Sequence, residues 1–206
     1  MEILPLFAQP VYIDVVDMPT DIVKRASKTA MQDMELDSHY SKNGSMSDDT
    51  QWLSHNLDVK DIVDTHMDIY VHEALAISRR HTIQHQSSWI NYHGIGDSAA
   101  EHTHPNSMFS GCLYIKVPPN CGEFRLRIPT MFPTYLTSTV QPDIMESNYL
   151  NQREFPIEPC DGTIIIFPSH LPHYVSPSET ESDRYSCAFN YFLKGTFGRE
   201  DTALTL

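Results

Sequence analysis

Two segments in the last third of the chain have the composition of strands buried on both faces, and they restrict the possible folds most. Residues 162–167 read Gly-Thr-Ile-Ile-Ile-Phe, so both faces of an extended chain are apolar there. In residues 184–193, Tyr185 and Phe189 share one face, while Arg184 and Ser186 share the other. An aromatic outer face needs a cover, so these strands require packing partners on both sides.

The rest of the second half also shows strand periodicity, interrupted by Pro and Gly residues. The first half instead has apolar residues at helical spacing, which predicts helices over residues 22–34 and 58–80. Together these elements predict a mainly β domain, a sandwich or barrel, with helices packed on its outside. The predicted strands cover residues 88–93, 108–117, 123–128, 162–167, 173–175 and 184–193.

The chain length of 206 residues suits one hydrophobic core and is short for two. We therefore expect a single domain over residues 1–206, in which residues 1–85 give mostly helical support and residues 86–206 form the β core. Residues 130–156 have weak periodicity and several polar side chains. They are expected to form a loop or lid over an open end of the core.

The composition argues against several classes of function. A formal net charge of −13 opposes non-specific binding to nucleic acid. No run of about 18 apolar residues is present, and the N-terminus lacks the pattern of a secretory signal, so neither a membrane span nor export is expected. The four cysteines have no CxxC spacing, which favours reduced thiols and a cytoplasmic location.

Three of the eleven histidines have a spacing that suits a metal site. His102 and His104 are two residues apart, so on a strand both imidazoles reach the same side, and His173 is the best candidate for a third ligand. Three ligands on one side of an ion leave positions open, as in non-haem Fe(II) oxygenases. The close pair alone is a weak signal. Other histidines have no such context and are interpreted as structural or solvated: His39, His55, His66, His72, His81, His85 and His93.

A positively charged clamp is predicted beside this metal site. Arg184 follows His173 after a polar turn, and adjacent antiparallel strands would bring both side chains to the inner face. A guanidinium binds a carboxylate through two parallel hydrogen bonds. Ser186 shares that face, and Tyr114 can place its phenol on the same carboxylate. The alternative is a surface arginine in a salt bridge, with Ser186 as a small core residue.

These residues stand in segments that resemble the 2-oxoglutarate/Fe(II)-dependent oxygenases, in particular the small bacterial and phage type, and more distantly the prolyl 4-hydroxylases. The resemblance spans most of the chain, is weakest over residues 130–156 and is most specific over residues 162–190. The segments are Leu-Pro-Leu-Phe-Ala-Gln-Pro-Val-Tyr at 4–12, Ser-Trp-Ile-Asn at 88–91, His-Thr-His-Pro at 102–105, Ser-Gly-Cys-Leu-Tyr at 110–114, Gly-Thr-Ile-Ile-Ile-Phe-Pro-Ser at 162–169, Leu-Pro-His at 171–173 and Arg-Tyr-Ser-Cys-Ala-Phe-Asn at 184–190.

The resemblance implies a double-stranded β-helix of the jelly-roll or cupin-like kind. The implied reaction uses molecular oxygen, converts 2-oxoglutarate into succinate and carbon dioxide, and hydroxylates a C–H bond of a peptide, an amino acid or a small metabolite. The implied residues are His102, His104 and His173 for Fe(II), and Arg184, Tyr114, Ser186 and Asn91 for 2-oxoglutarate.

One residue departs from the pattern of the wider superfamily, which has Asp or Glu at the position of His104. Three neutral imidazoles leave a more positive metal centre than two imidazoles and a carboxylate. This should weaken the retention of Fe(II) and favour an anionic cosubstrate. Two alternatives stay open: His104 turns away and leaves a two-histidine site, or the metal is not iron.

Two other functions stay open. A cupin-like enzyme with three histidine ligands would not use 2-oxoglutarate, and Arg184 would then have no part in its activity. A non-catalytic jelly-roll domain would bind a carbohydrate or a protein through residues 130–156. The sequence does not identify a substrate, although Trp89, Tyr92 and Tyr135 are candidates to shape a cleft. No oligomeric state is predicted.

Overall fold

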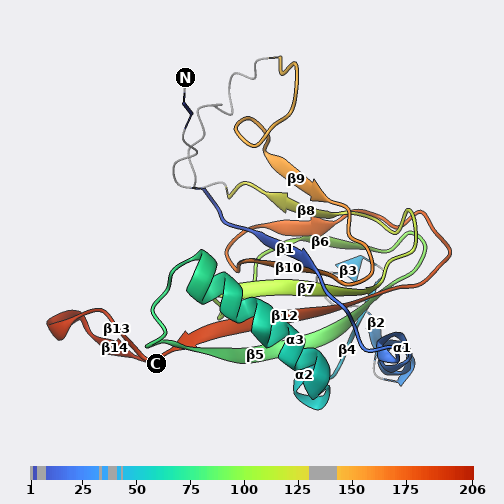
Figure 1. Ribbon diagram of the computed structural model, residues 1–206. Helices are drawn as coiled ribbons and strands as arrows, with labels where there is room; N and C mark the ends of the chain where they lie inside the picture. Colours follow the sequence, from blue (N-terminus) through green and yellow to red (C-terminus); the bar gives the residue numbers. More distant parts are fainter. Residues whose placement is uncertain (1, 4–7, 33, 37–40, 43, 130–142) are drawn as a thin grey trace.

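Two antiparallel sheets face each other, and helices cover the outer side of the larger sheet (Figure 1). The computed structural model describes residues 2–3, 8–32, 34–36, 41–42, 44–129 and 143–206. Several sequence-based expectations fall outside these residues, namely those for residues 4–7, for residues 130–142, and for His39 and Tyr135. Among the described residues, no helix is long and apolar enough to cross a membrane.

The strand order of each sheet is as follows, for the described part of the chain. The larger sheet contains β1 (Tyr12–Val15), β10 (Thr163–Pro168), β7 (Phe109–Lys116), β12 (Arg184–Lys194), β5 (Thr82–His93), β4 (Ser45–Ser47) and β2 (Met34–Leu36). The smaller sheet contains β3 (Ser41–Lys42), β6 (Ser98–His102), β11 (His173–Val175), β8 (Phe124–Arg127) and β9 (Glu154–Ile157). A separate hairpin of β13 (Thr196–Phe197) and β14 (Leu204–Thr205) follows β12, with the 3-10 helix η2 (Glu200–Thr202) between its strands.

Strand β10 shows why the larger sheet is covered on both faces. Ile164 and Ile166 pack in a core with the helices, whereas Ile165 and Phe167 pack in a second core between the two sheets. This alternation confirms that the apolar run is a strand buried on both sides. Burial of each such side chain contributes about 1.5–3 kcal/mol, so the strand joins three layers of structure into one unit.

The outer layer consists of α1 (Ile22–Gln32), α2 (Trp52–His55), α3 (Leu57–Asp68) and the π-helix η1 (Ile69–Ala74), which continues α3. In Figure 1, α3 lies across β12 and β5. Val59, Val63 and Met67 recur at helical spacing and are fully buried in the core that the helices share with the sheet. The prediction of one helix over residues 58–80 is wrong beyond η1, and the helix predicted over residues 22–34 ends earlier, because residue 34 lies in β2.

All six predicted strands are present, as β5, β7, β8, β10, β11 and β12. The mainly β class with flanking helices is therefore confirmed. Strand β5 is longer than predicted, since it begins at Thr82. Strands β1 to β4 have only two to four residues each, which is too short for a periodic pattern to reveal. Part of the predicted loop or lid forms strand β9, which pairs with β8.

Gly111 in β7 permits the close packing of the larger sheet. A Cβ atom at this position would collide with the ring of Phe189 and with the main-chain carbonyl of Ile165. Because the carbonyl belongs to a paired strand, it cannot move aside as a flexible side chain would. We predict that Gly111→Ala lowers the free energy of unfolding by about 1–3 kcal/mol, as measured by chemical denaturation.

Gly94→Ala is the matched control for this substitution. The nearest atoms to a Cβ at Gly94 belong to the side chains of Tyr92 and Asp97, at 3.1 Å or more. Its effect on the denaturation midpoint should be smaller. Equal midpoints for wild type and Gly111→Ala would contradict this account of the sheet packing.

Candidate active site

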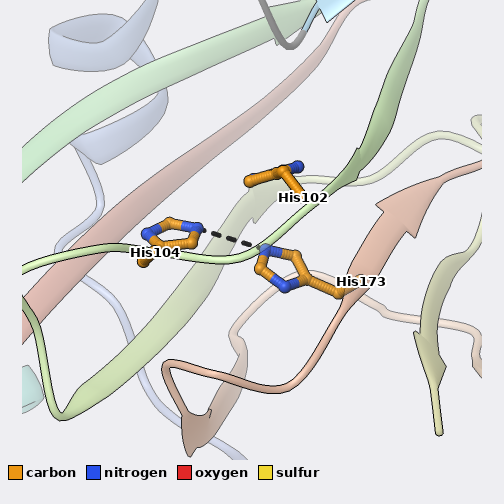
Figure 2. A group of neighbouring side chains, drawn as sticks. All are labelled: His102, His104 and His173. Carbon is orange, nitrogen blue, oxygen red and sulfur yellow. Dashed lines mark hydrogen bonds between the residues drawn. The ribbon is translucent and has the colours of Figure 1, made fainter. Parts of the chain in front are cut away.

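The three predicted histidines come together between the sheets. His102 ends β6, His173 begins β11, and these two residues are Cα partners in neighbouring strands. The ring centroids lie 4.3 Å apart for His102 and His173, 5.0 Å for His104 and His173, and 5.1 Å for His102 and His104. One ligand atom from each ring lies within 4.8 Å of the others, and Figure 2 shows the three side chains grouped around a common space.

The hydrogen bonds of the three rings identify the atoms that would bind a metal. The Nδ1 atom of His102 lies 2.7 Å from the Ala100 carbonyl oxygen, and that of His173 lies 3.0 Å from the Leu171 carbonyl oxygen. A carbonyl oxygen only accepts, so each Nδ1 carries the proton and each Nε2 presents a lone pair. The Nδ1 atom of His104 lies 2.7 Å from Oδ1 of Asn190, which gives the same assignment.

The Nε2 atoms of His104 and His173 lie 3.2 Å apart, along the dashed line in Figure 2. With both protons on Nδ1, two lone pairs face each other across this gap, and a cation between them removes the repulsion. Two nitrogens at right angles around an ion, each about 2.1 Å from it, are about 3 Å apart. The observed spacing therefore fits a metal ion.

Burial keeps these imidazoles in the neutral form that binds metals. It lowers the pKa of His104 to about 4, and the neighbouring His102 adds to the effect. Burial is also the main cause of the lowered pKa of His102 and of the pKa of His173, which lies well below its usual range. At neutral pH a cation therefore meets little competition from protons at this cluster.

One step of the sequence argument for the pair is wrong. Strand β6 ends at His102, so the alternation of a strand does not place His104 beside it. Instead, the main-chain N–H of His104 donates to the Ser169 carbonyl at 3.0 Å, which holds this segment against the turn after β10. The ring of Trp89 stacks on the His104 ring with centroids 5.9 Å apart. Glu101 forms an ion pair with Arg127, at 2.6 Å, rather than joining the cluster.

Arg184, the first residue of β12, is 1 % exposed, so the alternative of a surface salt bridge is wrong. Its Nη1 donates to the main-chain carbonyls of Cys121 and Gly122, at 3.2 and 3.5 Å. The guanidinium lies 5.0 Å from the centre of the Tyr114 ring. In the described part of the chain its Nε has no hydrogen-bond partner, and no Asp or Glu forms an ion pair with it. A buried cation without a carboxylate partner is a candidate binding site for an anionic ligand.

The prediction that Arg184 and His173 lie on adjacent strands is wrong. Strand β11 belongs to the smaller sheet and β12 to the larger one. The two side chains nevertheless line the same cavity of about 510 Å³ between the sheets. The histidine cluster and the buried guanidinium therefore share one cavity, although they reach it from opposite sheets and not from adjacent strands.

Unpartnered polar atoms gather around this cavity. Four buried atoms have no hydrogen-bond partner within the described part of the chain: the hydroxyl of Tyr114, Nε of Arg184 and both ring nitrogens of His93. Leaving such a group unsatisfied costs about 1–3 kcal/mol. A set of donors that face one cavity is expected where a ligand rich in oxygen acceptors binds.

The remaining predicted site residues divide into two groups. Ser186 and Asn91 line the cavity, as predicted, and are Cα partners in β12 and β5. Trp89 also lines it, and its Nε1 donates to Oδ1 of Asn91 at 3.0 Å. Tyr92 does not, because its hydroxyl donates to Asp183 and its ring packs against Tyr185.

Sequence reasoning missed His93, which it interpreted as structural or solvated. The side chain lines the cavity as the Cα partner of Arg184, and burial together with the Arg184 charge lowers its pKa to about 3. Strand periodicity contains the signal that would find it, since residues 89, 91 and 93 alternate onto one face. Asn190 was also missed, and its contact with His104 bridges residues far apart in the sequence.

Comparison with known proteins gives a family and a fold. A family model described as "Putative 2OG-Fe(II) oxygenase" matches residues 87–190, which is half of the chain. No curated protein sequence matches the chain. Similar solved structures include a prolyl-4-hydroxylase from Pseudomonas putida, with 13% identity, a TM-score of 0.54, and coverage of 92% of this chain and 96% of that one.

Two further structures resemble this chain. HygX from Streptomyces hygroscopicus, with nickel, 2-oxoglutarate and hygromycin B bound, has 9% identity and a TM-score of 0.57, with 89% and 82% of the two chains covered. A prolyl hydroxylase from Trichoplax adhaerens, in complex with a hypoxia inducible factor peptide fragment, has 13% identity and a TM-score of 0.60, with 88% and 83% covered. At these identities the likeness establishes the fold, and it confirms the expected double-stranded β-helix.

The geometry predicts that removal of one imidazole disrupts the metal site. His173→Ala should weaken binding of Co²⁺ about a hundredfold or more, since a direct ligand is lost, and loss of a residue that only hydrogen-bonds to a ligand already costs about 10–100-fold. Binding is measured by calorimetric titration of metal-free protein. His170→Ala is the control, because His170 is exposed and its ring lies at hydrogen-bond distance from Gln9, at 3.1 Å, outside the histidine cluster. Equal affinities for the two variants would contradict the site.

Proposed function

The chain belongs to the 2-oxoglutarate- and Fe(II)-dependent oxygenases, and within this family we propose that it hydroxylates a C–H bond of its substrate. One observation carries the proposal: three neutral imidazoles converge in a cavity that also contains a buried arginine, which has no acidic partner among the described residues. The cluster suits a divalent metal, and the guanidinium suits a carboxylate. Iron and 2-oxoglutarate together satisfy both.

We assign His102, His104 and His173 as the iron ligands, each through Nε2. When bound, the iron supplies the oxidative chemistry, with molecular oxygen as oxidant and 2-oxoglutarate as the source of electrons. The protein orients each ring through its Nδ1 hydrogen bond and keeps water out with apolar side chains. Phe124 and Phe167 pack against the His173 ring, with centroids 5.4 and 4.7 Å away. Three protein ligands leave open positions, as this chemistry requires.

We assign Arg184 as the anchor for the far carboxylate of 2-oxoglutarate, because this cation is buried and no anion pairs with it within the described ranges. Tyr114 and Ser186 line the same cavity and are assigned as hydroxyl donors to this carboxylate, and Asn91 lines the cavity as well. His93 adds an imidazole donor that has no acceptor among the residues that the structure describes. Three neutral metal ligands also fit this proposal, because they leave the charge of the metal ion uncompensated. The positive charge left at the metal and on Arg184 favours a dianionic cosubstrate over a neutral one.

The substrate is proposed to be a peptide, an amino acid or a small metabolite with an uncharged reacting part. The cavity lining includes Met46, Trp89, Thr103 and Pro105, none of which is charged, and the Trp89 ring stacks on the His104 ring. One of the similar structures holds hygromycin B and another holds a hypoxia inducible factor peptide fragment, so the fold accepts a small molecule in one of those proteins and a peptide in the other. The net charge of −13 supports a substrate other than nucleic acid.

We propose a cytoplasmic location for the enzyme. All four cysteines are free thiols in the structure, and three of them are buried. This pattern is common in reducing compartments.

The proposed function predicts succinate formation that depends on 2-oxoglutarate, Fe(II) and oxygen. Arg184→Gln should raise the KM for 2-oxoglutarate about 10–100-fold, since a charged hydrogen bond to the carboxylate is lost, with little change in Co²⁺ affinity. The measurement is the initial rate of succinate release over a range of 2-oxoglutarate concentrations. Activity that ignores 2-oxoglutarate, or that Arg184→Gln leaves unchanged, would favour a cupin-like metal enzyme instead.

The role given to His93 generates a separate prediction. His93→Phe keeps the ring volume but removes both nitrogens, so it should raise the Kd for 2-oxoglutarate about tenfold through loss of one buried hydrogen bond. Affinity is measured by calorimetry on the protein loaded with Mn²⁺ in place of iron. Tyr92→Phe is the control, because the neighbouring Tyr92 side chain binds Asp183 outside the cavity. An unchanged Kd for His93→Phe would remove this residue from the site.

A further inference from the structure

We propose that Asn190 is the positioning residue for His104: its side-chain carbonyl fixes the imidazole tautomer that presents Nε2 to the metal. The proposal rests on the proposed function only in taking His104 as a metal ligand. It concerns the one imidazole of the cluster that lies beyond the end of its strand, and it assigns a task to a side chain to which the sequence pattern gave no role.

The three imidazoles are held in two different ways. His102 and His173 each donate Nδ1–H to the main-chain carbonyl two residues before them, Ala100 and Leu171. These acceptors come with the local backbone. His104 lies beyond the end of its strand and donates instead to the side chain of Asn190 in β12, at 2.7 Å. Its orientation therefore depends on a side chain from the opposite sheet.

The surroundings of Asn190 hold its amide group in one orientation. Its Nδ2 donates to Oγ of Ser87 in β5 at 3.1 Å, and its Oδ1 accepts from Oγ of Ser110 in β7 at 2.7 Å. Asn190 is the Cα partner of both residues, so three adjacent strands fix the position of the amide. With Nδ2 committed to Ser87, the oxygen faces Ser110 and His104.

Three serine hydroxyls lie beside this amide. Ser107 donates to the main-chain carbonyls of Phe109 and Tyr191, at 3.0 and 3.2 Å, and Ser169 donates to Oγ of Ser107 at 2.9 Å. The protons of Ser107 and Ser169 therefore point away from Ser110, whose hydroxyl lies 2.8 Å from Ser169 and donates to Oδ1 of Asn190. The orientation of the amide thus depends on the bond from Nδ2 to Ser87, which leaves Oδ1 as the acceptor for the His104 Nδ1–H.

In this orientation an oxygen acceptor faces the His104 ring. A metal ion would favour the same orientation, because only here are the Nε2 lone pairs of His104 and His173 both available. Asn190 thus does for His104 what a main-chain carbonyl does for the other two rings, and what a carboxylate hydrogen-bonded to a ligand imidazole does in many metal sites.

Two substitutions of nearly the same size test the proposal. Asn190→Leu removes the acceptor, and Asn190→Asp retains it. Calorimetric titration of the metal-free full chain with Co²⁺, without 2-oxoglutarate, should show about 10–100-fold weaker binding for Asn190→Leu. Asn190→Asp should bind at least as tightly as wild type. Similar affinities for Asn190→Leu and wild type would overturn the proposal. If Asn190→Leu does not fold, Asn190→Asp decides the question, and a tenfold loss of affinity would overturn it.

Proton NMR of the Co²⁺ protein adds a measurement that a merely structural role would not move. Wild type should show one solvent-exchangeable, hyperfine-shifted Nδ1–H signal for each of the three ligand imidazoles. Asn190→Leu should lose one of them through rapid exchange, and Asn190→Asp should retain all of them. A full set of signals in Asn190→Leu would overturn the proposal. These results are independent of turnover, so they separate this inference from the proposed function, which the succinate measurement tests.

Discussion

The buried guanidinium of Arg184 is the constraint on which the site depends. A charge taken out of water without a partner costs several kcal/mol, and here two main-chain carbonyls compensate only one side of the group. Its Nε has no hydrogen-bond partner among the described residues, and the side chains of Arg184, Tyr114 and His93 all line the cavity. The fold thus retains an unfavourable arrangement. Under the proposed function the carboxylate of the cosubstrate offsets part of this cost of burial when it binds.

The two sheets form opposite walls of one cavity, and each wall carries a different part of the candidate site. The smaller sheet contributes His102 and His173, and the larger sheet contributes Arg184 and the amide that orients His104. A ligand that spans from metal to guanidinium therefore bridges the sheets. The helices pack on the far side of the larger sheet, where they bury the aromatic face of β12 and leave its polar face to the cavity. Because side chains alternate between the two faces of β12, this one strand contributes apolar residues to the core and polar residues to the cavity.

The buried strands and the close histidine pair could be predicted from the sequence, because each shows as a pattern among residues close together in the chain. The apolar run of β10 and the alternation of β12 required two-sided burial, and both strands lie where the pattern placed them. Spacing also identified the histidine cluster. The sequence could not show that His173 and Arg184 belong to different sheets. The chain crosses from one sheet to the other in the turn between them, and no sequence pattern marks this crossing. The contact between His104 and Asn190 was missed for the same reason, because only the folded chain brings them together.

The most direct test of the account is equilibrium binding of 2-oxoglutarate to the anaerobic protein, with and without Fe(II). The account predicts one bound 2-oxoglutarate per chain and a large gain in affinity when Fe(II) is present, since the metal and Arg184 hold opposite ends of the same molecule. Binding that does not respond to Fe(II), or no binding at all, would contradict the joint site that the three imidazoles and the guanidinium define.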